Sequence, residues 1–211
     1  MTEQSLPRRL AAFSSLAFYF AFATPAFAHH AMGGKLPSTF GEGFLSGLGH
    51  PVIGLDHLAF IVAAGVIAGV AGLGLWMPVV FVAASILGVF VHLQEINLPA
   101  VEILIALSVI GIGGLLAGNW GKLGRGAWAV MFAVAGVLHG YAFGESIVGA
   151  EPASLWAYLA GLAVIQSAIA VGAAALVARQ EWTTSTLAPR LVGAVVLGIG
   201  IAAFAGQVLP G

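Results

Sequence analysis

The chain has 211 residues, of which 60% are hydrophobic and 7% carry a charge, against about 25% charged residues in ordinary soluble domains. The share of hydrophobic residues is larger than the core of a soluble protein needs, and it predicts a protein of the lipid bilayer. The formal net charge of −1 gives no indication of nucleic-acid binding, and the absence of cysteine excludes disulfides and thiolate metal sites.

Residues 1–28 have the pattern of a cleavable secretory signal peptide. Two arginines precede an apolar stretch from Leu10 to Phe22, and an A-x-A cleavage site follows at residues 26–28. Cleavage there would make His29 the mature N-terminus and place it outside the cytoplasm. The alternative is an uncleaved first transmembrane helix, which the short apolar stretch and the proline after it disfavour.

Six apolar segments of about 20 residues, the length that crosses a bilayer, follow the signal sequence. They predict an all-α membrane protein with six transmembrane helices in one domain, residues 29–211. A shorter segment, Phe40 to Gly49, has apolar residues at helical spacing and predicts an interfacial helix. The six segments are Val52 to Gly72, Leu75 to Leu93, Leu98 to Gly118, Ala127 to Phe143, Ala153 to Ala178 and Leu191 to Val208.

The basic residues predict the same orientation as the signal sequence. With an external N-terminus, residues 119–126 and 179–190 become cytoplasmic connections, and these contain four of the five basic residues after position 28. Cytoplasmic loops are enriched in lysine and arginine. The sequence therefore predicts a multi-pass protein of the bacterial cytoplasmic membrane.

The run from His50 to His57, HPVIGLDH, puts two imidazoles and the Asp56 carboxylate at the start of the first span. Ionisable groups at membrane depth are costly and indicate function. A straight helix would hold the two imidazoles about 10 Å apart, too far to bind one ion through bonds of about 2.1 Å. Pro51 and Gly54 can break the helix, so the histidines either approach each other there or belong to successive sites. Alternatively, Pro51 simply starts the helix and His50 bonds a loop.

Further candidate ligands lie where the next three spans approach the same side. His92 and Glu95 are three residues apart near the end of the second span, so they would share a helix face. Glu102 begins the third span, and His139 and Glu145 end the fourth. These positions predict an external cation-binding vestibule, although acidic residues at helix ends are often just solvated.

Polar residues at two other places in the sequence also have candidate roles. After cleavage, the free amine with His29 and His30 would form a nitrogen-rich chelator for Ni²⁺ or Cu²⁺, unless the pair is coincidental. Gln166 lies in the middle of the fifth span, where an interhelical hydrogen bond is the simplest role.

The pattern His50-Pro-x-x-Gly-x-Asp-His57, together with His139-Gly-x-Ala-x-Gly-Glu145, resembles the HupE/UreJ family of nickel and cobalt permeases. The resemblance covers essentially the whole mature chain, and the first pattern is its specific part. It implies import of Ni²⁺ or Co²⁺ as the transported substrate, with no permanently bound cofactor and no enzymatic activity. It also implies metal-handling roles for His50, Asp56 and His57, with His139 and Glu145 as a second cluster.

One position departs from the family pattern. Many members resemble His-Gly-x-Ala-His-Gly-x-Glu in the fourth span, whereas Phe143 stands in place of the second histidine here and Glu145 comes one residue earlier. The loss of one imidazole leaves the choice between Ni²⁺ and Co²⁺ open. By family implication, nickel would serve hydrogenase or urease maturation, and cobalt would serve cobalamin synthesis.

The expected mechanism is that a hydrated divalent cation exchanges water for the vestibule ligands and then moves inward. Because few ionisable residues lie in the cytoplasmic half, a facilitator is favoured over proton-coupled exchange. We expect the metal ion and the bilayer as partners and leave a homo-oligomer open. The alternatives are an intramembrane zinc hydrolase and a haem protein with His57 and His139 as axial ligands.

Overall fold

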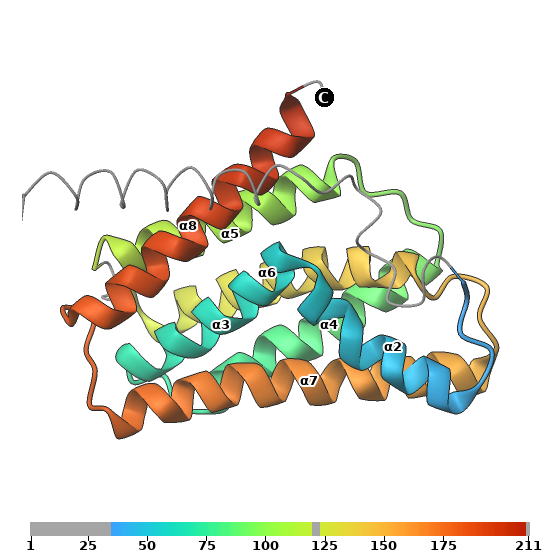
Figure 1. The fold of residues 1–211 in the computed structure, drawn as a ribbon, viewed down its shortest axis with the longest axis horizontal. Helices are drawn as coiled ribbons and strands as arrows, with labels where there is room; N and C mark the ends of the chain where they lie inside the picture. Colours follow the sequence, from blue (N-terminus) through green and yellow to red (C-terminus); the bar gives the residue numbers. More distant parts are fainter. Residues whose placement is uncertain (1–34, 120–122, 210–211) are drawn as a thin grey trace, which may run out of the picture.

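The computed structural model describes residues 35–119 and 123–209 of the chain. All regular secondary structure in these two ranges is α-helical, as predicted. The predicted signal peptide, His29, His30 and Lys122 lie outside the described residues. The helices are α2 (Phe40–Ile53), α3 (Leu55–Val70), α4 (Met77–Leu93), α5 (Val101–Ala117), α6 (Arg125–Glu145), α7 (Pro152–Arg179) and α8 (Leu187–Val208) (Figure 1).

Three helices, α6, α7 and α8, have the length and apolar composition needed to cross a membrane. Helices α2 and α3 pass the same test together, as one span that bends by 81° between them. Helices α4 and α5 are apolar but have 17 residues each, which is about 25 Å at 1.5 Å per residue. Each predicted segment therefore corresponds to a helix, while six membrane crossings remain a prediction.

Helix α2 differs most from its prediction. It begins where expected, because the Thr39 hydroxyl accepts a hydrogen bond from the Glu42 backbone N–H at 3.2 Å and caps the first turn. The predicted end at Gly49 is wrong, since the helix continues through Pro51 to Ile53. It packs lengthwise against α7, so it forms part of the bundle (Figure 1).

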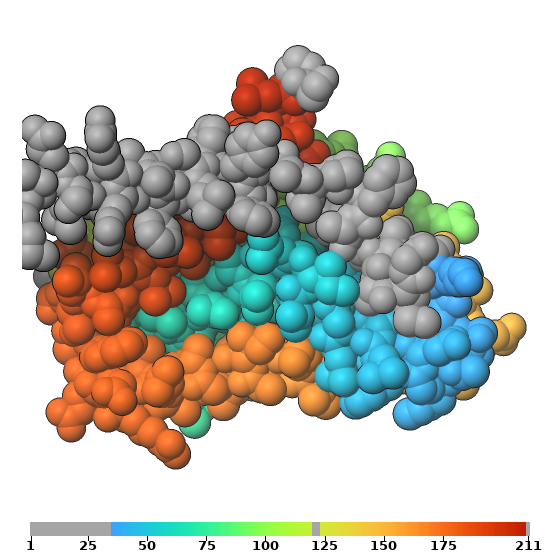
Figure 2. All heavy atoms as spheres, in the orientation of Figure 1, coloured from blue at the N-terminus to red at the C-terminus, as the bar shows by residue number. Residues whose placement is uncertain are grey.

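The closest helix pairs are α4 with α6, α5 with α8, and α2 and α3 with α7. Glycines line these contacts at positions where a Cβ atom would overlap the backbone of the facing helix, so the backbones approach closely. In the space-filling view, α2 and α7 form a continuous surface along one side of the molecule (Figure 2). The contact glycines are Gly88, Gly136 and Gly140 in α4 and α6, Gly113, Gly193 and Gly200 in α5 and α8, and Gly43, Gly47, Gly65 and Gly161 in α2, α3 and α7.

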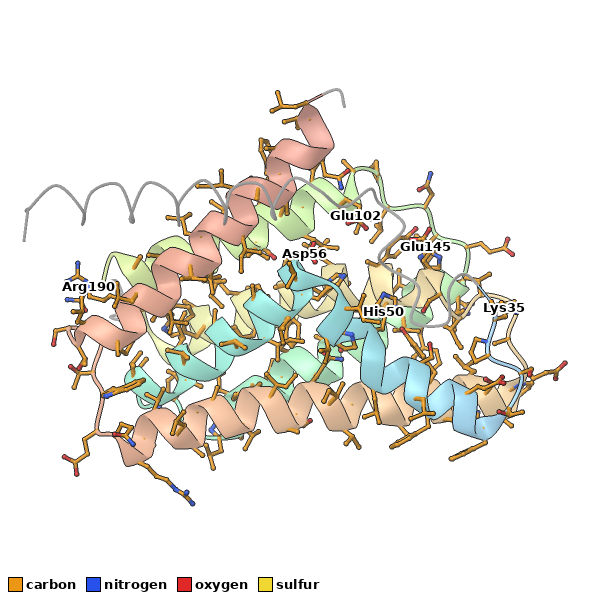
Figure 3. All side chains as sticks on the ribbon, in the orientation of Figure 1. Lys35, His50, Asp56, Glu102, Glu145 and Arg190 are labelled. Atoms are coloured by element: carbon orange, nitrogen blue, oxygen red, sulfur yellow. The ribbon has the colours of Figure 1, made fainter. Side chains whose placement is uncertain are left out.

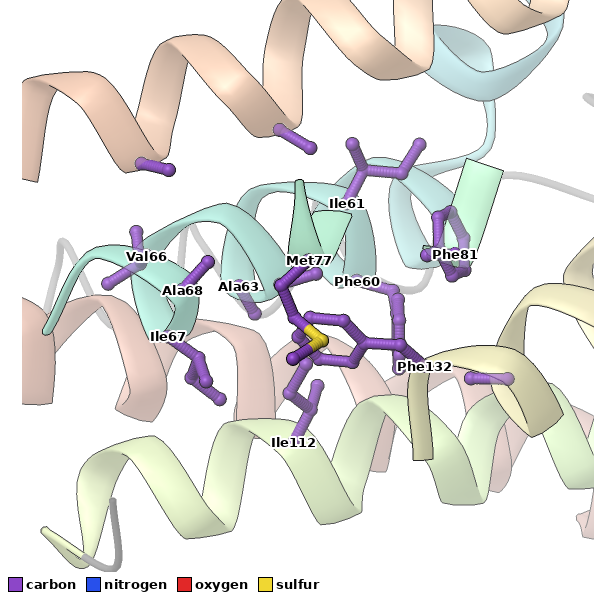
Figure 4. Close-up of a cluster of buried hydrophobic side chains, with 14 of the residues drawn as sticks. Phe60, Ile61, Ala63, Val66, Ile67, Ala68, Met77, Phe81, Ile112 and Phe132 are labelled. Carbon is purple, nitrogen blue, oxygen red and sulfur yellow. The ribbon is translucent and has the colours of Figure 1, made fainter. Parts of the chain in front are cut away.

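The apolar core surrounds α3, whose residues 59–61 and 63–68 are buried. Phe60 of α3 stacks on Phe81 of α4 with ring centroids 5.0 Å apart, and Phe132 of α6 meets Phe60 edge-on (Figure 4). Met77 and Ile112 complete this part of the cluster. The core therefore fixes α3 against α4, α5 and α6, the helices that also carry the candidate site.

Candidate functional site

The ionisable side chains highlighted by the sequence lie in one half of the bundle. His50, Asp56, Glu102 and Glu145 are all in this half, and Arg190 is at the far end of the other half (Figure 3). Helices α3 and α5 begin here, and α4 and α6 end here. These four candidate ligands therefore lie in the half of the bundle where α3 and α5 begin and α4 and α6 end.

The first motif folds as a sharp corner between two helices. Gly54 separates α2 from α3 and has an extended backbone, with φ −76° and ψ 104°. The 81° bend brings the imidazoles of His50 and His57 to a centroid separation of 6.3 Å, so the predicted helix break is confirmed. The alternative in which Pro51 starts the helix is wrong, because Pro51 lies near the end of α2. A Cβ atom on Gly54 would come within 2.6 Å of the His57 ring, which explains the glycine.

His57 of α3 and His139 of α6 form a close pair of imidazoles. Their Nδ1 atoms are 2.8 Å apart, and both side chains are buried, with exposures of 2% and 0%. Two nitrogen lone pairs at this distance repel, so a proton or another cation must lie between them. Two ligand nitrogens at right angles around an ion with bonds of about 2.1 Å would be about 3 Å apart. The spacing is that of an N–H···N hydrogen bond, and it is also close to the spacing of two adjacent metal ligands at right angles.

His50 belongs to a separate hydrogen-bonded group. Its Nδ1 lies 2.9 Å from the Tyr158 hydroxyl and 3.0 Å from the Ser146 hydroxyl. We assign the Tyr158 proton to the Phe143 carbonyl, 2.8 Å away, and with this assignment the hydroxyl oxygen accepts from His50 Nδ1–H. This arrangement leaves Nε2 as the nitrogen of His50 with a lone pair.

The phenyl ring of Phe143 contacts both parts of the site. Its centroid is 4.5 Å from that of His57 and 5.2 Å from that of His50, and the side chain is fully buried. Phe143 follows His139 by four residues, so both face the helix corner from α6. An apolar ring therefore occupies the place where the family pattern puts a second imidazole on this helix.

Asp56 and Glu102 occupy the first turns of α3 and α5. The Asp56 carboxylate accepts a hydrogen bond from the His57 backbone N–H at 2.8 Å and is partly buried. Carboxylates at helix N-termini are stabilised by the partial positive charge of the helix end. Both acidic groups therefore add negative charge to the half of the bundle that holds the histidines.

The predicted common helix face of His92 and Glu95 is wrong. Helix α4 ends at Leu93, and Glu95 closes it in the left-handed region with φ 58° and an exposed side chain. His92 packs edge-on against Tyr141 at 4.4 Å, and its buried Nδ1 has no hydrogen-bond partner. Glu145 is the last residue of α6 and is exposed.

Across residues 35–119 and 123–209, no three His, Asp or Glu side chains form a group that could hold one metal ion. A zinc hydrolase needs three such ligands, so this arrangement does not favour that alternative. Axial haem ligands lie on opposite sides of the iron, about 4 Å apart at bonds of about 2 Å. The 2.8 Å between His57 and His139 is too short for that geometry.

Sequence reasoning missed the hydroxyl partners of the histidines. Tyr158 and Ser108 lie in apolar helices and Ser146 caps the end of α6, and only the helix arrangement brings them to His50 and His139. A polar residue within an apolar segment is the sequence feature that could have indicated these hydrogen bonds between helices. Gln166 is such a residue, and its predicted interhelical hydrogen bond is confirmed by its contact with Ser85 on α4.

Comparison with known proteins agrees with the sequence motifs. The family model described as HupE / UreJ protein matches residues 16–203. Protein HupE of Rhizobium leguminosarum bv. viciae is 32% identical over 161 residues, which make up 74% of this chain and 80% of the relative. No solved structure matches. The match extends over most of the chain and includes both histidine motifs, and the chain therefore belongs to the HupE/UreJ family.

Proposed function

We propose that this protein is a membrane permease that imports a divalent transition-metal cation, Ni²⁺ or Co²⁺. The observation that carries the proposal is the buried imidazole pair of His57 and His139, with its Nδ1 atoms 2.8 Å apart. Imidazole suits nickel and cobalt as a ligand. Family membership supports the same function, because the motifs resemble those of nickel and cobalt permeases.

A two-imidazole site suits transport better than storage. The ion would bind the Nδ1 atoms of His57 and His139 after the proton between them has moved to Nε2 of His57, which keeps that ring neutral, and water or carboxylate oxygen would complete its shell. A carrier site must bind strongly enough to take up the ion and weakly enough to release it. A site with few protein ligands meets both conditions.

The other candidate ligands would act on the ion before it reaches the His57–His139 pair. Asp56 attracts the ion to the start of α3, and the His50 imidazole lies on the other side of the helix corner. We place the other carboxylates and His92 around the approach, where charge concentrates cations. The approach residues are His92, Glu95, Glu102 and Glu145, together with His29 and His30 at the mature N-terminus.

Beyond the pair, the route inward is closed by apolar packing. The ring of His139 is 4.8 Å from Phe60 and 5.6 Å from Phe81, and both phenyl rings are buried. Passage of a cation therefore requires these helices to move apart. Among the residues that the structure describes, no buried ionisable side chain lies beyond the pair, so we favour a facilitator driven by the metal gradient.

The proposed orientation places the site half outside and the arginine-rich end in the cytoplasm. Because the chain has no cysteine, single cysteines can report it. Val148→Cys, in the exposed connection after α6, should react with an impermeant maleimide in intact cells, and Ser185→Cys should react only after lysis. The opposite labelling pattern would reverse the proposed orientation.

Uptake by cells tests the function directly. We expect cells that express the intact chain to accumulate radioactive Ni²⁺ or Co²⁺, and Asp56→Asn to reduce this to near background because it removes the carboxylate at the start of α3. Glu181→Gln serves as the control, since this exposed carboxylate follows α7 at the far end. Full uptake by Asp56→Asn, at equal amounts of membrane protein, would contradict the proposal.

A further inference from the structure

The Ser108 hydroxyl on α5 lies within hydrogen-bonding distance of two groups, a backbone carbonyl and the ring of His139. Its hydroxyl lies 2.7 Å from the Ile105 carbonyl of the preceding turn, to which it can only donate. The same oxygen lies 3.0 Å from Nε2 of His139. A hydroxyl has one proton, and we assign it to the shorter contact, the one to the Ile105 carbonyl; the Ser108 oxygen then accepts from His139 Nε2–H.

This contact determines where His139 carries its proton. A neutral imidazole has one N–H and one lone pair, so a proton on Nε2 leaves the lone pair on Nδ1. That Nδ1 atom is the one 2.8 Å from His57. The side chain is fully buried, so water does not compete for either nitrogen.

We infer that Ser108 is a positioning residue that keeps His139 in the Nε2–H tautomer, with the Nδ1 lone pair directed at His57. The inference rests on the proposed function where it concerns metal binding, and on the geometry alone where it concerns the tautomer. Hydrogen bonds of this kind to the second nitrogen of a ligand histidine orient the ring and raise its basicity. Without the serine oxygen, a buried Nε2–H would lack an acceptor and the other tautomer would become populated.

The chain offers a closely matched control in Ser85 on α4. This serine also lies inside a helix and also donates to a carbonyl three residues earlier, that of Val82, at 2.8 Å, although it is fully buried and Ser108 is only partly buried. Its side-chain partner is Gln166 instead of a histidine. Ser85→Ala therefore removes the same type of interhelical hydroxyl without touching the imidazole pair.

The first experiment needs no metal. The full-length protein is labelled with ¹⁵N in its six histidines and purified in detergent, and the imidazole signals report which nitrogen of His139 is protonated. We expect a single Nε2–H tautomer in the wild type, in Ser85→Ala and in Ser108→Thr, which keeps the hydroxyl. Ser108→Ala should show a substantial Nδ1–H population. An unchanged tautomer in folded Ser108→Ala would overturn the inference.

The second experiment measures the Kd for Ni²⁺ of the same four proteins. Loss of an outer partner of a metal ligand weakens binding about 10- to 100-fold, so Ser108→Ala should raise the Kd by at least about tenfold, while Ser108→Thr and Ser85→Ala should not. If wild type binds and Ser108→Ala binds equally well, the role of Ser108 is wrong and the permease proposal stands. A wild type that binds neither Ni²⁺ nor Co²⁺ overturns the proposed function and the metal-binding role of Ser108 together.

Discussion

Replacement of His57 or His139 by alanine is expected to raise the Kd for Ni²⁺ at least about 100-fold. This is more than the loss of affinity typically seen when only the hydrogen-bond partner of a metal-binding histidine is removed. The reason is that the two Nδ1 atoms, 2.8 Å apart, act as one chelating unit. Once either imidazole is absent, only one nitrogen ligand remains to hold the ion in a buried site. The double variant should therefore bind little worse than either single variant.

Calorimetry or competition with a metal-sensitive dye on the purified protein would measure this cycle. His92→Phe is the control, because it removes an imidazole outside the His57–His139 pair. The His92 ring packs on Tyr141, and phenylalanine preserves this packing. We expect it to change the Kd by less than about tenfold, because its partners lie outside the imidazole pair. Fully additive losses in the His57 and His139 variants would contradict a shared ion.

The largest expected effect on stability is at Gly140, which follows His139 on α6. A Cβ atom there would overlap the Ser85 carbonyl oxygen and lie 2.6 Å from the Ser85 Cα atom. Gly140→Ala should therefore force α4 and α6 apart and destabilise the fold by about 2 kcal/mol, as overpacking in a tight core does. Gly140→Leu should prevent the two helices from assembling.

Thermal unfolding of the detergent-solubilised protein would measure these changes. Gly172→Ala is the matched control, because this glycine lies inside α7 with no atom within 4 Å of its Cβ position. Alanine is the better helix former by roughly 1 kcal/mol, so this variant should be at least as stable as the wild type. Equal stability of Gly140→Ala and Gly172→Ala would show that the α4–α6 contact is looser than described.

Much of the fold could be predicted from the sequence because membrane helices are built from local information. Composition indicated the bilayer, and the apolar segments located six of the seven described helices to within a few residues. The end of α2 was missed because proline usually marks the start of a helix. Here Pro51 is tolerated three residues before the break at Gly54, where few backbone bonds remain to lose.

The site was predictable only in part. The approach of His50 and His57 followed from a local break at Gly54, which the motif itself indicates. The pairing of His57 with His139 and the hydroxyl contacts of Ser108 and Tyr158 depend on which helices are neighbours. Those neighbours are chosen by glycine contacts between helices distant in the sequence, so no local pattern reveals them.

Metal uptake by liposomes that contain the purified protein and no energy source would show whether the protein is a permease. We expect saturable entry of Ni²⁺ or Co²⁺ down its gradient, and loss of that entry in both His57→Ala and His139→Ala. Liposomes without protein set the background, and protease protection verifies insertion. Entry no faster than this background, or equal entry in wild type and both variants, would contradict a permease that carries metal through the imidazole pair.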